Sequence, residues 1–258
     1  MPAVVPSADV THTGSTEATV RRSKKSTPYL LLIPGLAWLA VFFIVPLFSL
    51  FLTSLQVPVE EGNPDAGFAQ AFEVSNYTNA LSEYMPQFIR SFIFAGAATL
   101  LALAIAYPLA YFIAFKAGTW RNLMRSLVVA PFFCSFLIRT YAWKTILADQ
   151  SPVTQFLNAL NLLPDNRILN TPIAVITGIA YNFLPFMTLP LYAALEKIDP
   201  RLIEAAGDLY SSPFTGFRKV TFPLSLPGVV AGTLLTFIPA VGDYINAQLL
   251  GSIKDKMI

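Results

Sequence analysis

Residues 29–55 read YLLLIPGLAWLAVFFIVPLFSLFLTSL and contain no charged side chain. A helix that crosses the hydrocarbon core of a membrane needs about 20 consecutive, mostly apolar residues, so this run is long enough to span. It is too long for the apolar core of a cleaved signal peptide, and it lacks an A-x-A cleavage site. We therefore expect an uncleaved membrane anchor.

The composition extends this expectation to the whole chain of 258 residues. Hydrophobic residues make up 55% and charged residues 12% of it, whereas about 25% of a typical soluble protein is charged. A surface with so little charge is not suited to water, so we predict an all-α, polytopic transmembrane helix bundle. The further stretches that are long and apolar enough to span are 88–115, 123–147, 172–195 and 226–250, which makes five spans.

The basic residues predict the orientation of these spans. Four lie at 21–25, three at 116–125 and four at 197–219, and together they are 11 of the 17 in the chain. If the spans alternate in direction, all three regions lie on one side, which the positive-inside rule assigns to the cytoplasm. We thus expect a cytoplasmic N-terminus in a bacterial cytoplasmic membrane. Residues 1–27, rich in Ser, Thr and Val, are predicted to be a disordered cytoplasmic tail ahead of a transmembrane domain at 28–258.

The residues needed for most enzyme chemistry are missing from the predicted bundle. His12 is the only histidine and lies in the tail, and Cys134 is the only cysteine. A Ser/His or Cys/His dyad and a His/Cys metal cluster are therefore excluded within the bundle. The phosphate-binding pattern GxxxxGK[ST] is also absent. We expect no catalytic residue, no metal, no cofactor and no nucleic-acid partner, and any uphill transport must use an ion gradient or a partner.

A polar segment between the last two predicted spans has the pattern of two short helices. Asp199-Pro200 and Ser212-Pro213 each place an N-cap residue before a proline, which is a helix start signal. We expect one helix from Pro200 to about residue 210, and a second from Pro213 to about residue 220 that Pro223 ends. Four apolar side chains exceed what so small a hairpin can bury, and we expect them to form a docking surface. They are Leu209, Tyr210, Phe214 and Phe217.

The order of residues in this segment resembles the EAA loop of ABC importer permeases. The match consists of Glu204-Ala205-Ala206 followed by Val220-x-Phe222-Pro223. The family pattern is EAA-x3-G-x9-I-x-L-P, and the chain departs from it with Tyr210 at the glycine position. The resemblance implies a coupling loop at 196–223 that docks on the ATP-hydrolysing subunits. The residues it assigns to this coupling are Glu204, Ala205, Ala206, Leu209, Tyr210, Phe214 and Phe217.

Stretches outside the loop resemble the spermidine/putrescine branch of these permeases. They include SFLIRTYAWKTIL at 135–147, YNFLPFMTLPLYAALEKID at 181–199 and FIPAVGDYINAQLLG at 237–251. The resemblance implies a polyamine importer whose partners are ABC ATPase subunits, a second permease subunit, an extracytoplasmic substrate-binding protein and the lipid bilayer. A permease for another small solute such as iron(III) would look similar. The family has six spans in this region, and the sixth is not visible here.

Three residues are candidates for the substrate path. Asp243 is a carboxylate inside the fifth predicted span, where it could serve a cationic substrate or pair with Arg139 or Lys144 for structure. Tyr181 and Asn182 are polar residues of the fourth span, and Tyr181 could equally belong to the aromatic belt. The rival classes are a gradient-driven transporter or channel, for which Asp243 is the one coupling carboxylate, and a structural anchor, which would not need the two-helix loop.

Overall fold

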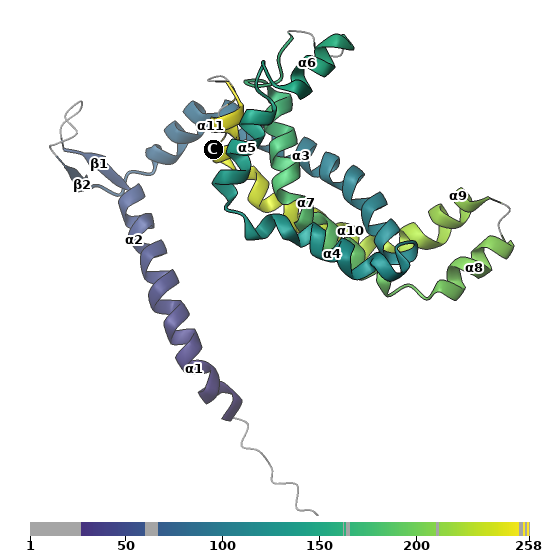
Figure 1. Cartoon of the computed structure of the whole chain (residues 1–258). Helices are drawn as coiled ribbons and strands as arrows, with labels where there is room; N and C mark the ends of the chain where they lie inside the picture. Colours follow the sequence, from purple (N-terminus) through teal and green to yellow (C-terminus); the bar gives the residue numbers. More distant parts are fainter. Residues whose placement is uncertain are drawn as a thin grey trace, which may run out of the picture. The chain divides into compact units, whose positions relative to one another are not determined.

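The computed structural model describes residues 27–59, 67–161, 163, 166–209, 212–252, 255 and 257, and it is almost entirely helical (Figure 1). Two compact units make up the chain, residues 1–79 and 80–258. Four helices in the described ranges are long and apolar enough to cross a membrane, and a bent pair of helices would make a fifth span. The predicted all-α, polytopic fold is thus confirmed. Most of the predicted tail lies outside the described residues, and the first helix begins at Thr27.

The first unit holds the N-terminal span and a small hairpin. The span consists of α1 (Thr27–Leu39), a π-helical turn (Ala40–Ile44) and α2 (Val45–Ser54). The π turn stands directly before Val45-Pro46, and a proline cannot donate to the preceding turn, so a widened turn accommodates it. Antiparallel strands β1 (Gln56–Pro58) and β2 (Phe68–Gln70) follow.

The second span is a long helix that packs through small residues. Helix α3 (Ser75–Phe115) starts 13 residues before the predicted span at 88–115. The part in the second unit buries mainly alanine, at three- and four-residue spacing: Ala95, Ala98, Ala102, Ala106, Ala110 and Ala114. Small side chains let helix backbones approach closely, which is how helices associate where lipid removes the hydrophobic driving force.

The third predicted span, 123–147, is not one helix. A 3-10 turn (Gly118–Trp120), α4 (Arg121–Val129) and a second 3-10 turn (Ala130–Phe133) form one arm, and α5 (Phe136–Ile146) forms the other, at 96° to the first. Pro131 removes a backbone donor, and Cys134 and Ser135 have extended ψ angles of 142° and 139°. The prediction of a continuous helix was therefore wrong, because a break of this kind depends on a few backbone angles.

The last two large helices form the centre of the second unit. A short helix, α6 (Pro152–Ala159), precedes α7 (Pro172–Glu196), whose N-cap Thr171 accepts from the backbone of Ala174. Helix α10 (Phe222–Val241) packs along α7 through a face of small residues, namely Ser225, Gly228, Gly232, Thr236 and Ala240, all of them buried. Gly228 and Gly232 form a GxxxG pair, the spacing that brings two membrane helices into close contact.

The helical stretch from Pro213 to Val241, which includes α10, begins and ends at other residues than the sequence predicted. Helices α8 (Pro200–Leu209) and α9 (Pro213–Gly216) begin where the Asx/Ser-Pro signals placed them. However, Pro223 does not end the second helix. A π turn (Phe217–Thr221) follows α9 directly, and α10 continues from it with Pro223 in its first turn. The bounds of the fifth predicted span, 226–250, also differ: a spanning helix is present, but it runs from Pro213 to Val241, and a separate short helix, α11 (Tyr244–Leu250), follows.

Candidate functional site: a two-helix hairpin and a buried polar cluster

Helices α8 and α9 form a two-helix hairpin at one end of the second unit, and α5 and α11 lie toward the other end (Figure 1). Ala206 is 4% exposed, and a Cβ on Gly216 would lie 3.5 Å from the Cβ of Ala206. The two helices thus meet at an alanine and a glycine. A side chain larger than alanine at position 206 would press against α9, which gives Ala206 a packing role.

The outer face of the hairpin carries charge and apolar side chains together. Glu204 and Ala205 are exposed, Leu209 is 80% exposed and Phe214 is 70% exposed. Two bulky apolar side chains so open to solvent suit a surface that another protein covers. Tyr210, another member of the predicted patch, lies outside the described residues.

Phe217 does not belong to this exposed face. Its ring centroid lies 5.6 Å from that of Tyr107 and 6.1 Å from that of Tyr111, both in edge-to-face geometry on α3. The expectation that Phe217 contributes to the docking surface is therefore not supported, because its ring packs against α3. Phe217 instead joins the hairpin to the bundle.

A hydrogen bond reinforces this junction. The Tyr107 hydroxyl and the Ser225 hydroxyl are 2.7 Å apart, and Ser225 also donates to the carbonyl of Phe222 at 2.9 Å. The contact links α3 to the first turn of α10, one turn beyond the π segment. A displacement of the hairpin therefore meets α3 and α10 at the same place.

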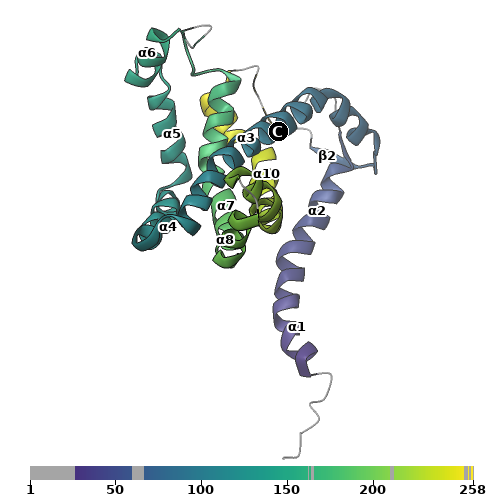
Figure 2. The same ribbon diagram turned by 90° about the vertical axis from the view of Figure 1, so that its right-hand side faces the viewer.

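A polar cluster is buried where α5, α7 and α11 meet, and Figure 2 shows α5 running alongside α7. The Asn182 side-chain amide donates to Thr140 Oγ1 at 3.3 Å and to Asn246 Oδ1 at 3.2 Å. The Asn246 amide in turn donates to Asp243 Oδ2 at 2.5 Å. None of the four side chains is more than 7% exposed, and Asn182 Oδ1 has no hydrogen-bond partner within the part of the chain that the structure describes. Buried polar atoms are normally paired, so this oxygen is an open acceptor.

Asp243 occupies a helix start and not the middle of a span. It follows Gly242 after α10, and its Oδ1 accepts from the Asn246 backbone at 3.1 Å, which caps α11. Neither Arg139 nor Lys144 pairs with it among the described residues; the Arg139 guanidinium lies 5.8 Å and 5.9 Å from the rings of Phe136 and Phe132. The structural ion pair considered for Asp243 is therefore not formed.

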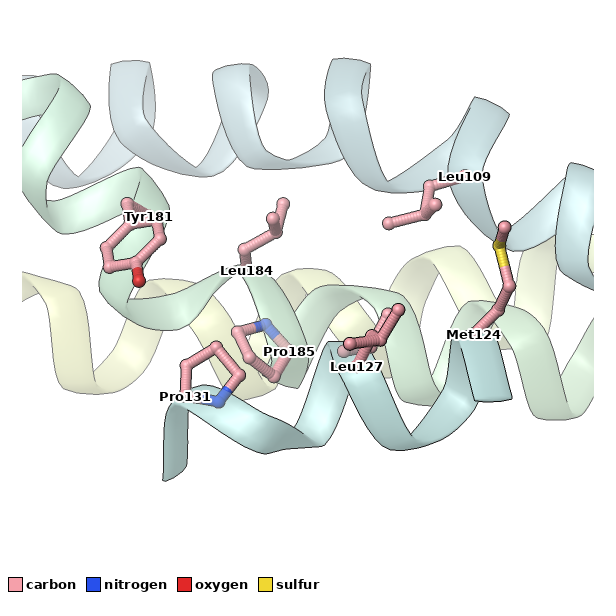
Figure 3. Close-up of a pocket in the computed structure, with 8 residues that line it drawn as sticks. Leu109, Met124, Leu127, Pro131, Tyr181, Leu184 and Pro185 are labelled. Carbon is pink, nitrogen blue, oxygen red and sulfur yellow. The ribbon is translucent and has the colours of Figure 1, made fainter. Parts of the chain in front are cut away.

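Tyr181 lies apart from this cluster although it precedes Asn182 in the chain. Successive residues of a helix point about 100° apart, and Tyr181 faces Trp143, with ring centroids 5.3 Å apart, and a pocket of about 260 Å³ (Figure 3). The pocket lies between α3, α4 and α7. Its lining is apolar apart from the Tyr181 side chain: Leu109, Met124, Leu127, Val128, Pro131, Leu184 and Pro185.

The sequence did not point to Thr140, Asn246, Tyr107 or Ser225 as members of these sites. The contact between Asp243 and Asn246 has a local sequence signal, because an Asp at the N-cap of a helix accepts from the backbone N–H three residues later. Thr140, Tyr107 and Ser225 have none, because each finds its partner on a helix distant in sequence.

Comparisons with known proteins agree on one family. The family model described as "binding-protein-dependent transport system inner membrane component" matches residues 106–257. The spermidine/putrescine transport system permease protein PotB of Haemophilus influenzae is 39% identical over 84% of this chain and 76% of its own length. PotB of Escherichia coli is 36% identical over 88% of this chain and 82% of its own.

A solved structure shows the same fold. A chain of a bacterial ABC transporter involved in the import of the acidic polysaccharide alginate superposes with a TM-score of 0.65 at 17% identity, covering 88% of this chain and 78% of that one. At this identity the likeness concerns the fold alone.

Proposed function

The chain belongs to the family of binding-protein-dependent transport system inner membrane components, and on that premise we propose that it is the polyamine-translocating permease subunit of an ATP-driven importer. The observation that carries the substrate class is the 36–39% identity to spermidine/putrescine permeases over more than four fifths of the chain. The partners are ABC ATPase subunits, a second permease subunit and an extracytoplasmic binding protein. The chain itself contributes no ATPase site.

We propose that the hairpin of α8 and α9 is cytoplasmic and docks on an ATPase subunit. Its support is the excess of basic residues at 197–219 and the exposed Leu209 and Phe214. Glu204 and Ala205 would lie in the contact with the ATPase, whereas Ala206 holds the hairpin together. Phe217 would carry movement inward through Tyr107.

The proposed route of this movement is a single helix. From Pro213 to Val241 the chain is helical over 29 residues, and helices rise 1.5 Å per residue, so its length is about 43 Å. One end carries the hairpin, and the other reaches Gly242 and Asp243. Closure of the ATPases would shift this helix along α7 and so reach the buried polar cluster.

We propose that Asp243 and Asn182 serve the cationic substrate. A carboxylate inside a membrane bundle is costly without a cation, and its described partners are neutral amides. When the cluster opens, an ammonium group of the substrate can pair with the Asp243 carboxylate. The Asn182 side-chain oxygen can accept a hydrogen bond from the same group. Tyr181 has no part in this contact, because it faces the apolar pocket.

Uptake by the reconstituted complex tests the function. Proteoliposomes that contain the permease pair, the ATPases and the binding protein should accumulate labelled spermidine or putrescine only with internal ATP. Uptake that an ion gradient drives without ATP would assign a secondary transporter. Uptake of iron(III) with no effect of either polyamine would replace the substrate class and leave the permease assignment standing.

A further inference from the structure

The apolar pocket beside Tyr181 has an elongated form that follows α4. Its lining runs along α4 from Met124 to Val128 and on to Pro131 in the 3-10 turn that follows, and Leu109 and Met124 lie at one end while Tyr181 lies at the other (Figure 3). Seven residues of helix rise about 10 Å, so the pocket is long relative to its volume of about 260 Å³. This form suits a hydrocarbon chain better than a compact solute.

Cations border the Met124 end of this pocket. Arg121 and Arg125 lie one turn apart on α4, and Lys116 lies just before it. Arg121 meets Glu196 at 3.7 Å, and the Arg125 guanidinium lies 5.4 Å from the centre of the Tyr192 ring. No Asp or Glu occurs between residues 84 and 148, so α4 and the segment before it carry these three cations and no carboxylate of their own.

The same end carries the aromatic side chain typical of a membrane boundary. Trp120 is 63% exposed and directly precedes Arg121. Tryptophan is enriched at the level of the lipid headgroups, and basic pockets on the cytoplasmic side of membrane proteins bind anionic headgroups.

We propose that this pocket is a binding site for an anionic phospholipid of the cytoplasmic leaflet. One acyl chain lies along α4 between Leu127 and Leu184, and the phosphate contacts Arg121 and Arg125. The proposal rests on the orientation given above, but not on the transported solute. Hydrocarbon contact gives little preference over bulk lipid, so the two arginines supply the selectivity, about fivefold for each.

A photoactivatable phosphatidylglycerol with a diazirine in one acyl chain tests the site. The assembled transporter is reconstituted in phosphatidylcholine vesicles that contain this probe, irradiated and digested, and the adducts are mapped. Adducts are expected on the pocket residues of α4 and α7. Unlabelled phosphatidylglycerol should compete, whereas phosphatidylcholine and inorganic phosphate should not.

Two variants and a control sharpen the test. Arg121→Gln with Arg125→Gln should reduce labelling by about 25-fold, because both charges are lost. Leu127→Trp should reduce it by filling the pocket, and since Leu127 is 59% exposed, the larger ring is compatible with folding. Lys144→Gln, which removes an exposed charge on α5, should leave labelling unchanged.

Equal labelling by a phosphatidylcholine probe, or labelling unchanged in the double arginine variant, overturns the proposal. So does a crosslinker at position 127 that captures the second permease subunit in place of lipid. None of these readouts measures uptake, so the site and the proposed transport function fail independently.

Discussion

Replacing Gly228 by alanine adds a methyl group between α10 and α7. The new Cβ would lie 2.5 Å from the Cβ of Ala194, 2.8 Å from the carbonyl oxygen of Pro190 and 3.2 Å from the Cα of Leu191. Carbon atoms in contact are about 3.5–4.0 Å apart, so the helices must separate by about 1 Å. Two of the three atoms belong to the backbone and cannot rotate away.

The magnitude follows from two opposing effects. Inserting a methyl group into a packed contact costs about 1–3 kcal/mol, and the rigid backbone atoms favour the upper end. Alanine gains about 1 kcal/mol over glycine in helix propensity. We expect Gly228→Ala to lower the free energy of unfolding by about 2 kcal/mol. For a chain of this size, that lowers the melting temperature by about 4–8 °C.

Gly96→Ala is the matched control, because Gly96 also lies inside a helix and a Cβ there would meet no atom within 4 Å. This variant should be as stable as the parent, or up to about 1 kcal/mol more stable. Thermal unfolding of the purified protein in detergent, followed by size-exclusion of the heated samples, compares the two. Equal melting temperatures for both variants would show that α10 and α7 do not approach this closely.

Three further predictions concern the proposed function. Glu204→Lys should abolish ATP-driven uptake and weaken co-purification of the ATPase, with little change in melting temperature. The control Asp208→Lys, on the same helix, should retain more uptake. Normal uptake in Glu204→Lys would exclude the coupling role of Glu204. A cysteine at Leu209 in a Cys134→Ala background should resist an impermeant maleimide in intact cells and react in inverted vesicles, and the reverse result inverts the topology. Asp243→Asn keeps an N-cap for α11, so assembly should be normal while polyamine uptake falls at least tenfold; full uptake excludes a role in the path.

The helix starts of the hairpin could be predicted because their signals are local. Pro200 and Pro213 begin α8 and α9 as the preceding Asp199 and Ser212 indicated, and the Asp199 carboxylate accepts from the backbone of Arg201 at 2.9 Å. The membrane-spanning helices could also be predicted from the sequence, since a long apolar run without charge is sufficient to identify one.

The continuation through Pro223 was not predictable in the same way. A proline inside a helix normally ends or bends it, and whether a π turn absorbs it depends on packing around that turn. Here Phe217 fits against Tyr107 on α3, a residue 110 positions earlier in the chain. The course of the chain at Pro223 thus depends on a contact between residues distant in sequence.

The buried cluster illustrates the same limit for the candidate site. Asp243 and Asn182 were singled out as polar residues in apolar runs, but the residue that joins them is Asn246, and Thr140 on α5 completes the group. Their proximity follows from the 96° bend before α5 and from the break at Gly242, neither of which has a distinctive sequence pattern.

The continuity of the helix from Pro213 to Val241 has a mechanical consequence for the proposed importer. A loop that ended at Pro223 would allow the hairpin to pivot freely, and its movement would be lost before it reached the membrane. A continuous helix held against α7 through Gly228 and Gly232 transmits an axial or rocking displacement along its length. The break at Gly242 then lets α11 and Asp243 respond separately from α10. On this reasoning, variants at Glu204 and Asp243 should have distinct effects, the first on ATPase association and the second on recognition of the cation.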